Sequence, residues 1–233
     1  MYYDIKIYFM KIDRNPLLIL FTFCLLFLVR PDASSQSGRE EATIRIGSQI
    51  WMAQNLNVDR YWDGRPIPEA KTIKEWNYYN EHKIGCWCNY DNEGCYGSMY
   101  GKLYNWYAIR QNVAPRCWRL PSKADFDKLI GYLGESKAGK QLKATHSWNN
   151  TTNGTNQSGW GAFAGGCRNI LGYFSYVGRQ GFWWTNDARK DNNAGLFVSI
   201  TSDDIVSYEI SEGFGYSVRC VRDAGFPAPE PCP

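Results

Sequence analysis

The residues of this chain best suited to chemistry are its cysteines. The chain has 233 residues and eight cysteines, and three of these crowd into the stretch CWCNYDNEGC at Cys86–Cys95. Cysteines act as disulfide partners, metal ligands or nucleophiles. A zinc site would need a different spacing than C-x-C, and neither His82 nor His146 stands in a ligand pattern. We therefore favour disulfides. They are the default for cysteines in exported proteins, and the N-terminus of this chain predicts export.

Export is predicted from the N-terminus. Residues 1–33 combine a basic start, the apolar run Pro16–Val29 and small residues from Ala33 onward, which is typical of a signal peptide. The apolar run is shorter than the roughly 20 residues of a membrane span, although an uncleaved anchor is the alternative. We expect a secreted or cell-surface protein that meets the membrane only through this segment. Cleavage would remove Cys24 and leave seven cysteines, an odd number.

Histidines and carboxylates offer little catalytic potential. A nucleophile needs an adjacent base, and the only two histidines lie in predicted loops. The acids of Asp91–Glu93 and Ser202–Asp204 resemble a glycosidase pair, but acid-rich turns are usually only turns. We expect no enzyme. Asp91, Asn92 and Glu93 carry hard oxygen ligands, so a structural calcium ion is the one cofactor we consider.

Aromatic side chains provide a different chemistry, the binding of sugars. The chain has 10 Trp and 16 Tyr, whose rings are suited to surfaces that are both apolar and wet. Neighbours on a strand point to opposite faces, so we expect one of Trp183 and Trp184 in the core and the other facing outward. The alternative is that these rings only fill a core. The candidate ligand-binding residues are Trp160, Tyr173, Tyr176, Trp183, Trp184 and Asn186.

Three arginines near these rings are interpreted differently. We expect Arg168, Arg179 and Arg219 to hold loops together through backbone carbonyls rather than to bind anions. The net charge is +3 and there is no long basic run, which argues against nucleic acid as a partner.

The elements that would position these residues begin with a hairpin. Alternation over Ala42–Leu56 predicts a β-hairpin that turns at Gly47-Ser48, and residues 57–98 are predicted to be long ordered loops. The clearest helix is Leu120–Gly134, with a capping box of Ser122 and Asp125 and one apolar face. A second helix is expected over Glu135–Ala144.

Later segments have the character of strands. They are Gly195–Ile200, Ile205–Ile210 and Tyr216–Val221, with turns at Ser202–Asp204 and Glu212-Gly213. We expect one α+β domain over residues 42–223, in which one or two early helices pack on a twisted antiparallel sheet. A flexible linker (34–41) precedes it and a proline-rich tail (224–233) follows.

Six motifs in order carry a resemblance to a known family. They are IGSQIWMAQNLNV (46–58), CNYDNEGCYGSMYGKLYNWYA (88–108), WRLPSKADFDKL (118–129), SGWGAFAGGCRN (158–169), GFWWTND (181–187) and GYSVRCVRD (215–223). Together they resemble the Fibrobacter succinogenes major paralogous domain family, whose members are secreted or surface-attached proteins of the Bacteroidetes and their relatives. A second, looser resemblance is to the C-type-lectin-like fold, which formylglycine-generating enzymes share. It is carried by the order of three segments: WRLPS before a helix, then WW, then SVRCV near the end of the domain.

This second resemblance implies a loop-rich, disulfide-bearing fold but no activity. The copper-binding cysteine motif of formylglycine-generating enzymes has no match here. The stretch Trp184–Asp187 is similar to the calcium strand of lectins, but Thr185 interrupts it and the usual Glu-Pro-Asn partner is absent. We therefore do not expect a calcium bridge to sugar.

The cysteines depart from the family pattern. Cys88 and Cys220 match its usual cysteines. Cys117 and Cys167 stand where the family has glycine and an aromatic residue, and Cys86 and Cys95 are additional. From these departures we expect two bridges peculiar to this chain, Cys117–Cys167 and Cys86–Cys95, although the sequence itself does not fix the connectivity.

The function expected is non-enzymatic binding outside the cell, with a glycan or a host or neighbouring protein as ligand. Two alternatives stay open: a structural surface module without a small ligand, and an enzyme of formylglycine-generating or glycosidase type. An exposed aromatic cluster beside polar groups would favour the binding module.

Overall fold

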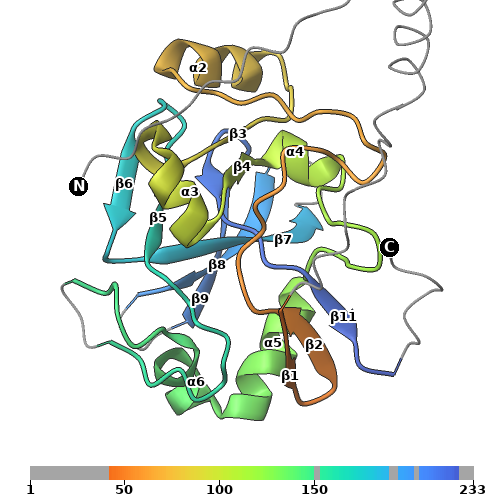
Figure 1. Cartoon of the computed structure of the whole chain (residues 1–233), viewed down its shortest axis with the longest axis vertical. Helices are drawn as coiled ribbons and strands as arrows, with labels where there is room; N and C mark the ends of the chain where they lie inside the picture. Colours follow the sequence, from red (N-terminus) through yellow and green to blue (C-terminus); the bar gives the residue numbers. More distant parts are fainter. Residues whose placement is uncertain (1–41, 150–152, 189–193, 202–204, 226–233) are drawn as a thin grey trace, which may run out of the picture. The chain divides into compact units, whose positions relative to one another are not determined.

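The computed structural model describes residues 42–149, 153–188, 194–201 and 205–225 (Figure 1). The predicted signal peptide, linker and turn at 202–204 lie outside these residues, as does the tail from residue 226. Within the described ranges, no helix is long and apolar enough to cross a membrane.

The predicted N-terminal hairpin is confirmed. It consists of β1 (Thr43–Ile46) and β2 (Gln49–Met52), and β2 also pairs with β11 (Val221–Asp223), so the order is β1-β2-β11. Gly47 forms the turn with a φ of +59°, a conformation that glycine adopts at little cost. The beginning and the end of the domain therefore share one small antiparallel sheet.

The central sheet has five short strands in the order β3-β4-β10-β5-β6. They are β3 (Trp87–Cys88), β4 (Leu103–Asn105), β10 (Gly215–Tyr216), β5 (Gly165–Arg168) and β6 (Phe174–Val177). The single strand predicted over Tyr216–Val221 is wrong, because the chain leaves the central sheet after Tyr216 and joins the N-terminal sheet at Val221.

A third sheet is a meander of β7 (Gly181–Ala188), β8 (Ala194–Ile200) and β9 (Ile205–Ser211). A parallel bridge between Trp183 and Ser217 connects β7 to the segment after β10. The two strands predicted here, β8 and β9, are confirmed.

The two predicted helices are present as α5 (Lys123–Leu133) and α6 (Glu135–Leu142). The capping box is formed, because the Asp125 backbone amide donates to Ser122 Oγ and the Ser122 amide donates to Asp125 Oδ2. Phe126 and Leu129 are the fully buried apolar residues of α5.

The prediction of long loops over residues 57–98 is wrong in part. This region contains α2 (Ile73–Glu81), the short 3-10 helix η1 (Tyr90–Asn92) and the start of α3 (Gly94–Tyr100), and α4 (Trp106–Arg110) follows. Figure 1 shows α2 and α3 on the side of the sheets away from α5 and α6. The fold is thus α+β, as predicted, with more helices than the one or two expected.

Both tryptophans of β7 are fully buried, so the prediction of an outward ring is wrong. Their side chains do point to opposite faces of the strand, but each face is covered. Trp183 packs in a cluster with Trp51 and Trp160, and Trp184 packs in the main cluster with Trp106. The strand β7 therefore lies between two hydrophobic cores.

The two predicted bridges are also wrong. Cys86, Cys88, Cys95 and Cys167 are free thiols, which rules out both Cys86–Cys95 and Cys117–Cys167. Cys86 and Cys88 are buried beside Trp76, whereas Cys95 is exposed, so burial separates the members of the first pair. Burial raises the pKa of Cys88 and of Cys167 to about 12, which keeps both as neutral thiols that pack like small apolar side chains.

Candidate ligand-binding site

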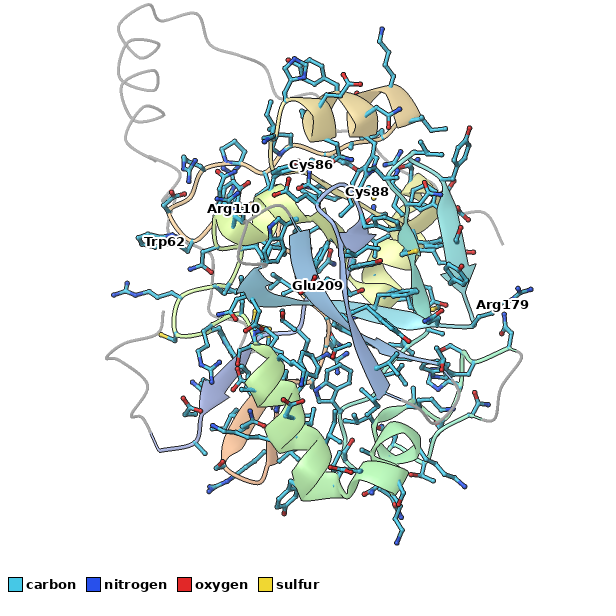
Figure 2. The ribbon with its side chains drawn as sticks, turned by 180° about the vertical axis from the view of Figure 1, so that it is seen from behind. Trp62, Cys86, Cys88, Arg110, Arg179 and Glu209 are labelled. Carbon is cyan, nitrogen blue, oxygen red and sulfur yellow. The ribbon has the colours of Figure 1, made fainter. Side chains whose placement is uncertain are left out.

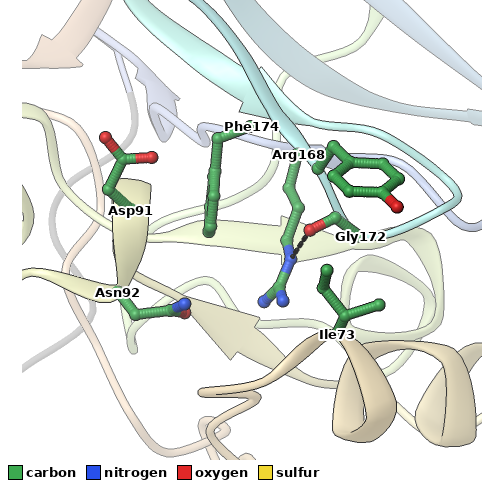
Figure 3. A pocket seen from close by; sticks show the side chains of 7 residues that line it. Ile73, Asp91, Asn92, Arg168, Gly172 and Phe174 are labelled. Atoms are coloured by element: carbon green, nitrogen blue, oxygen red, sulfur yellow. Dashed lines mark hydrogen bonds between the residues drawn. The ribbon is translucent and has the colours of Figure 1, made fainter.

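A pocket of about 420 Å³ lies at the tip of the β5–β6 hairpin, where the hairpin meets the start of α2 and η1 (Figure 3). It is lined by Ile73, Asp91, Asn92, Arg168, Gly172, Tyr173 and Phe174. Segments about 100 residues apart in the sequence thus form one concave surface.

The hairpin tip is held by a dense set of hydrogen bonds. Asn169 Oδ1 accepts from the backbone amides of Leu171 and Tyr173, at 3.0 Å each, and the Asn169 amide donates to the Tyr173 carbonyl at 2.8 Å. Gly172 completes the turn with a φ of +86°. As a result, Leu171 and Tyr173 are presented on a well-ordered turn with 61% and 58% of their surface exposed.

The tip is anchored to α2. A Cβ atom at Gly172 would lie 3.2 Å from Ile73 Cγ2, so glycine allows the turn to approach the first residue of the helix. The helix itself begins with a capping box, in which the Glu75 amide donates to Thr72 Oγ1 and the Thr72 amide donates to Glu75 Oε2. Ile73 is 42% exposed and extends the apolar rim of the pocket.

Arg168 lies under the pocket and is fully buried. Its Nε donates to the Gly172 carbonyl at 3.0 Å and its Nη1 to the Ala70 carbonyl at 2.7 Å, which confirms the predicted role of tying loops together. Its Cζ lies 4.7 Å from the ring centre of Trp76 and 4.8 Å from that of Phe174. Its Nη2 has no hydrogen-bond partner.

The acidic side of the pocket comes from η1. Asp91 and Asn92 have φ values of +50° and +59°, a left-handed conformation that Asp and Asn tolerate better than most residues. Both are exposed, and Glu93, the third residue of the predicted calcium loop, does not line the pocket. In the described ranges, no three His, Cys, Asp or Glu residues gather as a metal site would require, and calcium binding stays a prediction.

Of the predicted ligand-binding residues, only Tyr173 lines this pocket. Tyr176 is 54% exposed at the other end of β6, where its ring lies 5.8 Å from that of Phe182. Asn186 is exposed and lines a different pocket of about 390 Å³, together with Trp106 and Arg110.

The three tryptophans proposed as stacking platforms are corrected here. Trp160, Trp183 and Trp184 have no exposed surface, so they have no ring face to offer to a ligand. The indole groups are also used internally: Trp183 Nε1 donates to Asn55 Oδ1 at 2.9 Å, and Trp184 Nε1 donates to the Tyr104 carbonyl at 2.7 Å. These residues hold the fold.

Sequence reasoning missed Ile73 as a lining residue and did not connect Arg168 to a pocket. The Thr72-x-x-Glu75 capping box would have located α2 and hence Ile73. The position of Arg168 had no local sequence signal, because the rings on either side of its guanidinium come from residues 76 and 174.

The lining residues are suited to binding. They supply a cation, an amide, a carboxylate and two aromatic rings, and none of them is His, Cys, Ser or Lys. Both histidines are exposed elsewhere: His82 stacks on Tyr78 and His146 lies beside Phe163. The pocket can therefore hold a small polar ligand with one apolar face.

Comparison with models of protein families matches residues 44–222 to the Fibrobacter succinogenes major domain. No curated protein matches the chain. No solved structure matches it. The family match spans most of the chain and agrees with the resemblance of the six motifs. The chain belongs to the Fibrobacter succinogenes major domain family.

Proposed function

We propose that this protein is an exported, non-enzymatic binding module that holds a glycan at the tip of the β5–β6 hairpin. The observation that carries the proposal is the exposed Tyr173 ring beside a pocket with amide and charged groups. Sugars are bound in this way when an aromatic ring covers their C–H face and polar side chains take their hydroxyl groups.

The rigidity of the hairpin tip supports the proposal. Asn169 and Gly172 fix the backbone of Tyr173, so little conformational entropy is lost when a ligand binds. Leu171 and Ile170, which are 61% and 45% exposed, extend the apolar surface around the pocket. A protein ligand at the same surface is the alternative, since contiguous exposed apolar side chains also mark protein contacts.

We also infer a C-type-lectin-like architecture and an N-terminal signal peptide. The C-type-lectin-like architecture is supported by the order of three features along the chain: the capped helix α5, the strand β7 with its two tryptophans, and the SVRCV segment near the end of the domain. The basic start and apolar run of residues 1–33 support the signal peptide, and with it a location at the bacterial surface or outside the cell.

A structural module is the second candidate function. It is favoured by the complete burial of Trp160, Trp183 and Trp184, which shows that much of the aromatic content serves packing. Such a module would bind no small ligand, and a change at Tyr173 would alter no binding.

A glycan array with the purified protein, run with calcium and with a chelator, tests the proposal. We expect saturable binding that is lost in Tyr173→Ala and kept in Tyr132→Ala. Tyr132 is a matched control because it is a similarly exposed tyrosine, at 67%, on the distant helix α5. Binding that survives in Tyr173→Ala, or no binding to any glycan, would contradict the proposal, and a calcium requirement would point to the Asp91–Glu93 loop.

A further inference from the structure

We infer that the ligand of this pocket carries a carboxylate and that the bound sugar is a uronic acid. The inference rests on the proposed glycan binding and narrows its ligand class. Its basis is the positive charge of Arg168 beneath the pocket.

No carboxylate in the described part of the chain forms an ion pair with Arg168. Other arginines differ: Arg119 pairs with Asp125 at 2.5 Å and with Asp223 at 3.3 Å. Arg219 is equally buried, but all three of its guanidinium nitrogens donate, two to Asn55 Oδ1 and one to the Trp160 carbonyl. Arg168 uses two nitrogens on backbone carbonyls, and its guanidinium also lies beside the neutral Cys88 thiol, while Nη2 makes no hydrogen bond to an oxygen.

A buried cation without a counter-ion is costly, because the low-dielectric interior does not solvate it. The rings of Trp76 and Phe174 and the two carbonyls offset part of this cost. The rest would be offset by an anion in the adjoining pocket, where the attraction is stronger than it would be in water.

The arrangement of the pocket leaves room for such an anion. Figure 3 shows the guanidinium of Arg168 between Phe174 and Ile73, on the side of the pocket where Asn92 extends its amide. The carboxylate of Asp91 lies on the other side of the Phe174 ring in this view and points away from Arg168. The one acid of the lining therefore does not occupy the position beside the cation.

A uronic acid combines the groups that the lining can recognise. Its ring has an apolar face for Tyr173, its hydroxyl groups suit the Asn92 amide, and its carboxylate is attached directly to the same rigid ring. A volume of about 420 Å³ suits one sugar unit with its neighbours extending outward. A peptide carboxylate lacks the flat ring that would use Tyr173.

The test compares acidic sugars with neutral copies of the same shape. Trigalacturonic acid and a glucuronic-acid trisaccharide are titrated calorimetrically into the full protein, beside the same compounds with their carboxylates converted to primary amides. We expect at least one acid to bind about 10-fold more tightly than its amide, the scale of the attraction between the buried guanidinium and a carboxylate in the adjoining pocket. Arg168→Gln should bring this ratio close to one, and Arg168→Lys should keep most of it.

The control is Arg179→Gln, which removes the same charge from the other end of the hairpin region, where Figure 2 shows Arg179 extending outward. It should leave the ratio unchanged. Equal affinity for acid and amide in the unaltered protein would overturn the carboxylate inference and leave glycan binding standing. Binding of neutral glycans only would do the same, whereas no glycan binding of any kind would overturn both. These comparisons need no variant, so a variant that fails to fold does not prevent the test.

Discussion

At the scale of single residues, exposed and buried rings have different roles. Trp184 is fully buried and donates to the Tyr104 carbonyl, whereas Tyr173 is 58% exposed on a turn. One residue stabilises the core, and the other is available to a ligand.

Trp184→Ala is therefore expected to lower the free energy of unfolding by about 3–5 kcal/mol, because it leaves a cavity in the core. Tyr173→Ala should change it by less than about 0.5 kcal/mol, as surface substitutions usually do. Urea unfolding followed by circular dichroism measures both values. A stable Trp184→Ala protein that has lost ligand binding would instead place Trp184 in the site.

Asp125 links stability to pH. Burial by itself would raise the pKa of this carboxyl group, but the Arg119 guanidinium and the Ser122 amide and hydroxyl outweigh burial and hold the pKa at about 2. A pKa below the unfolded value contributes stability above about pH 4 that is lost as the pH falls toward 2. The half-exposed Arg119 is partly screened, so we expect a contribution of about 1–2 kcal/mol.

Asp125→Asn should remove this contribution at pH 7, and the difference from the unaltered protein should shrink between pH 4 and pH 2. Free energies of unfolding measured across this range check the prediction. Asp127→Asn is the control, because Asp127 is exposed and pairs with Lys123. An Asp125→Asn difference that persists unchanged at pH 2 would show that the carboxylate charge is not its cause.

At the scale of elements, the β5–β6 hairpin determines the site because its turn must approach α2. Gly172→Ala should cost about 1 kcal/mol for the left-handed backbone and push against Ile73, so that binding weakens several-fold. The matched control is Gly131→Ala in α5, where an added Cβ meets open space and helix propensity improves. Unfolding and ligand titration of both variants check this, and unchanged affinity in Gly172→Ala would contradict it.

Elements with strong local patterns could be predicted from the sequence. Helix α5 has both a capping box and an apolar face, while α2 has the capping box but only Trp76 as a buried residue. The missing apolar period explains why α2 was predicted as loop. The adjacent tryptophans Trp183 and Trp184 predicted two side chains on opposite faces of a strand, as β7 has them. That both faces of β7 are covered is decided by tertiary packing, which the local sequence does not reveal.

The pocket could not be predicted because it forms from long-range contacts. Trp76 Nε1 donates to the Asn169 carbonyl, 93 residues away, and the same two segments enclose Arg168. Tyr173 was predicted as a ligand-binding residue because aromatic side chains in a glycine-flanked stretch are candidates for an exposed patch. The residues that give the pocket its charge and its rim have no such pattern.

At the scale of the whole molecule, burial rather than disulfide bonding protects the Cys88 and Cys167 thiols from reaction. Iodoacetamide is expected to modify exposed Cys95 in the folded protein, while buried Cys88 and Cys167, with their raised pKa values, react only after unfolding. Mass spectrometry of the peptides gives the order of modification. A peptide pair joined through Cys86 and Cys95 would contradict the account.

The central claim is that a glycan binds at the tip of the β5–β6 hairpin, and amide hydrogen exchange with and without a bound glycan tests it most directly. The glycan is one that binds in the array screen, or trigalacturonic acid. The account predicts slower exchange in peptides that cover residues 168–174, 71–76 and 89–93, with little change over residues 119–126 beside the second pocket. Protection confined to the second pocket, or to β9, would contradict it and place the ligand elsewhere.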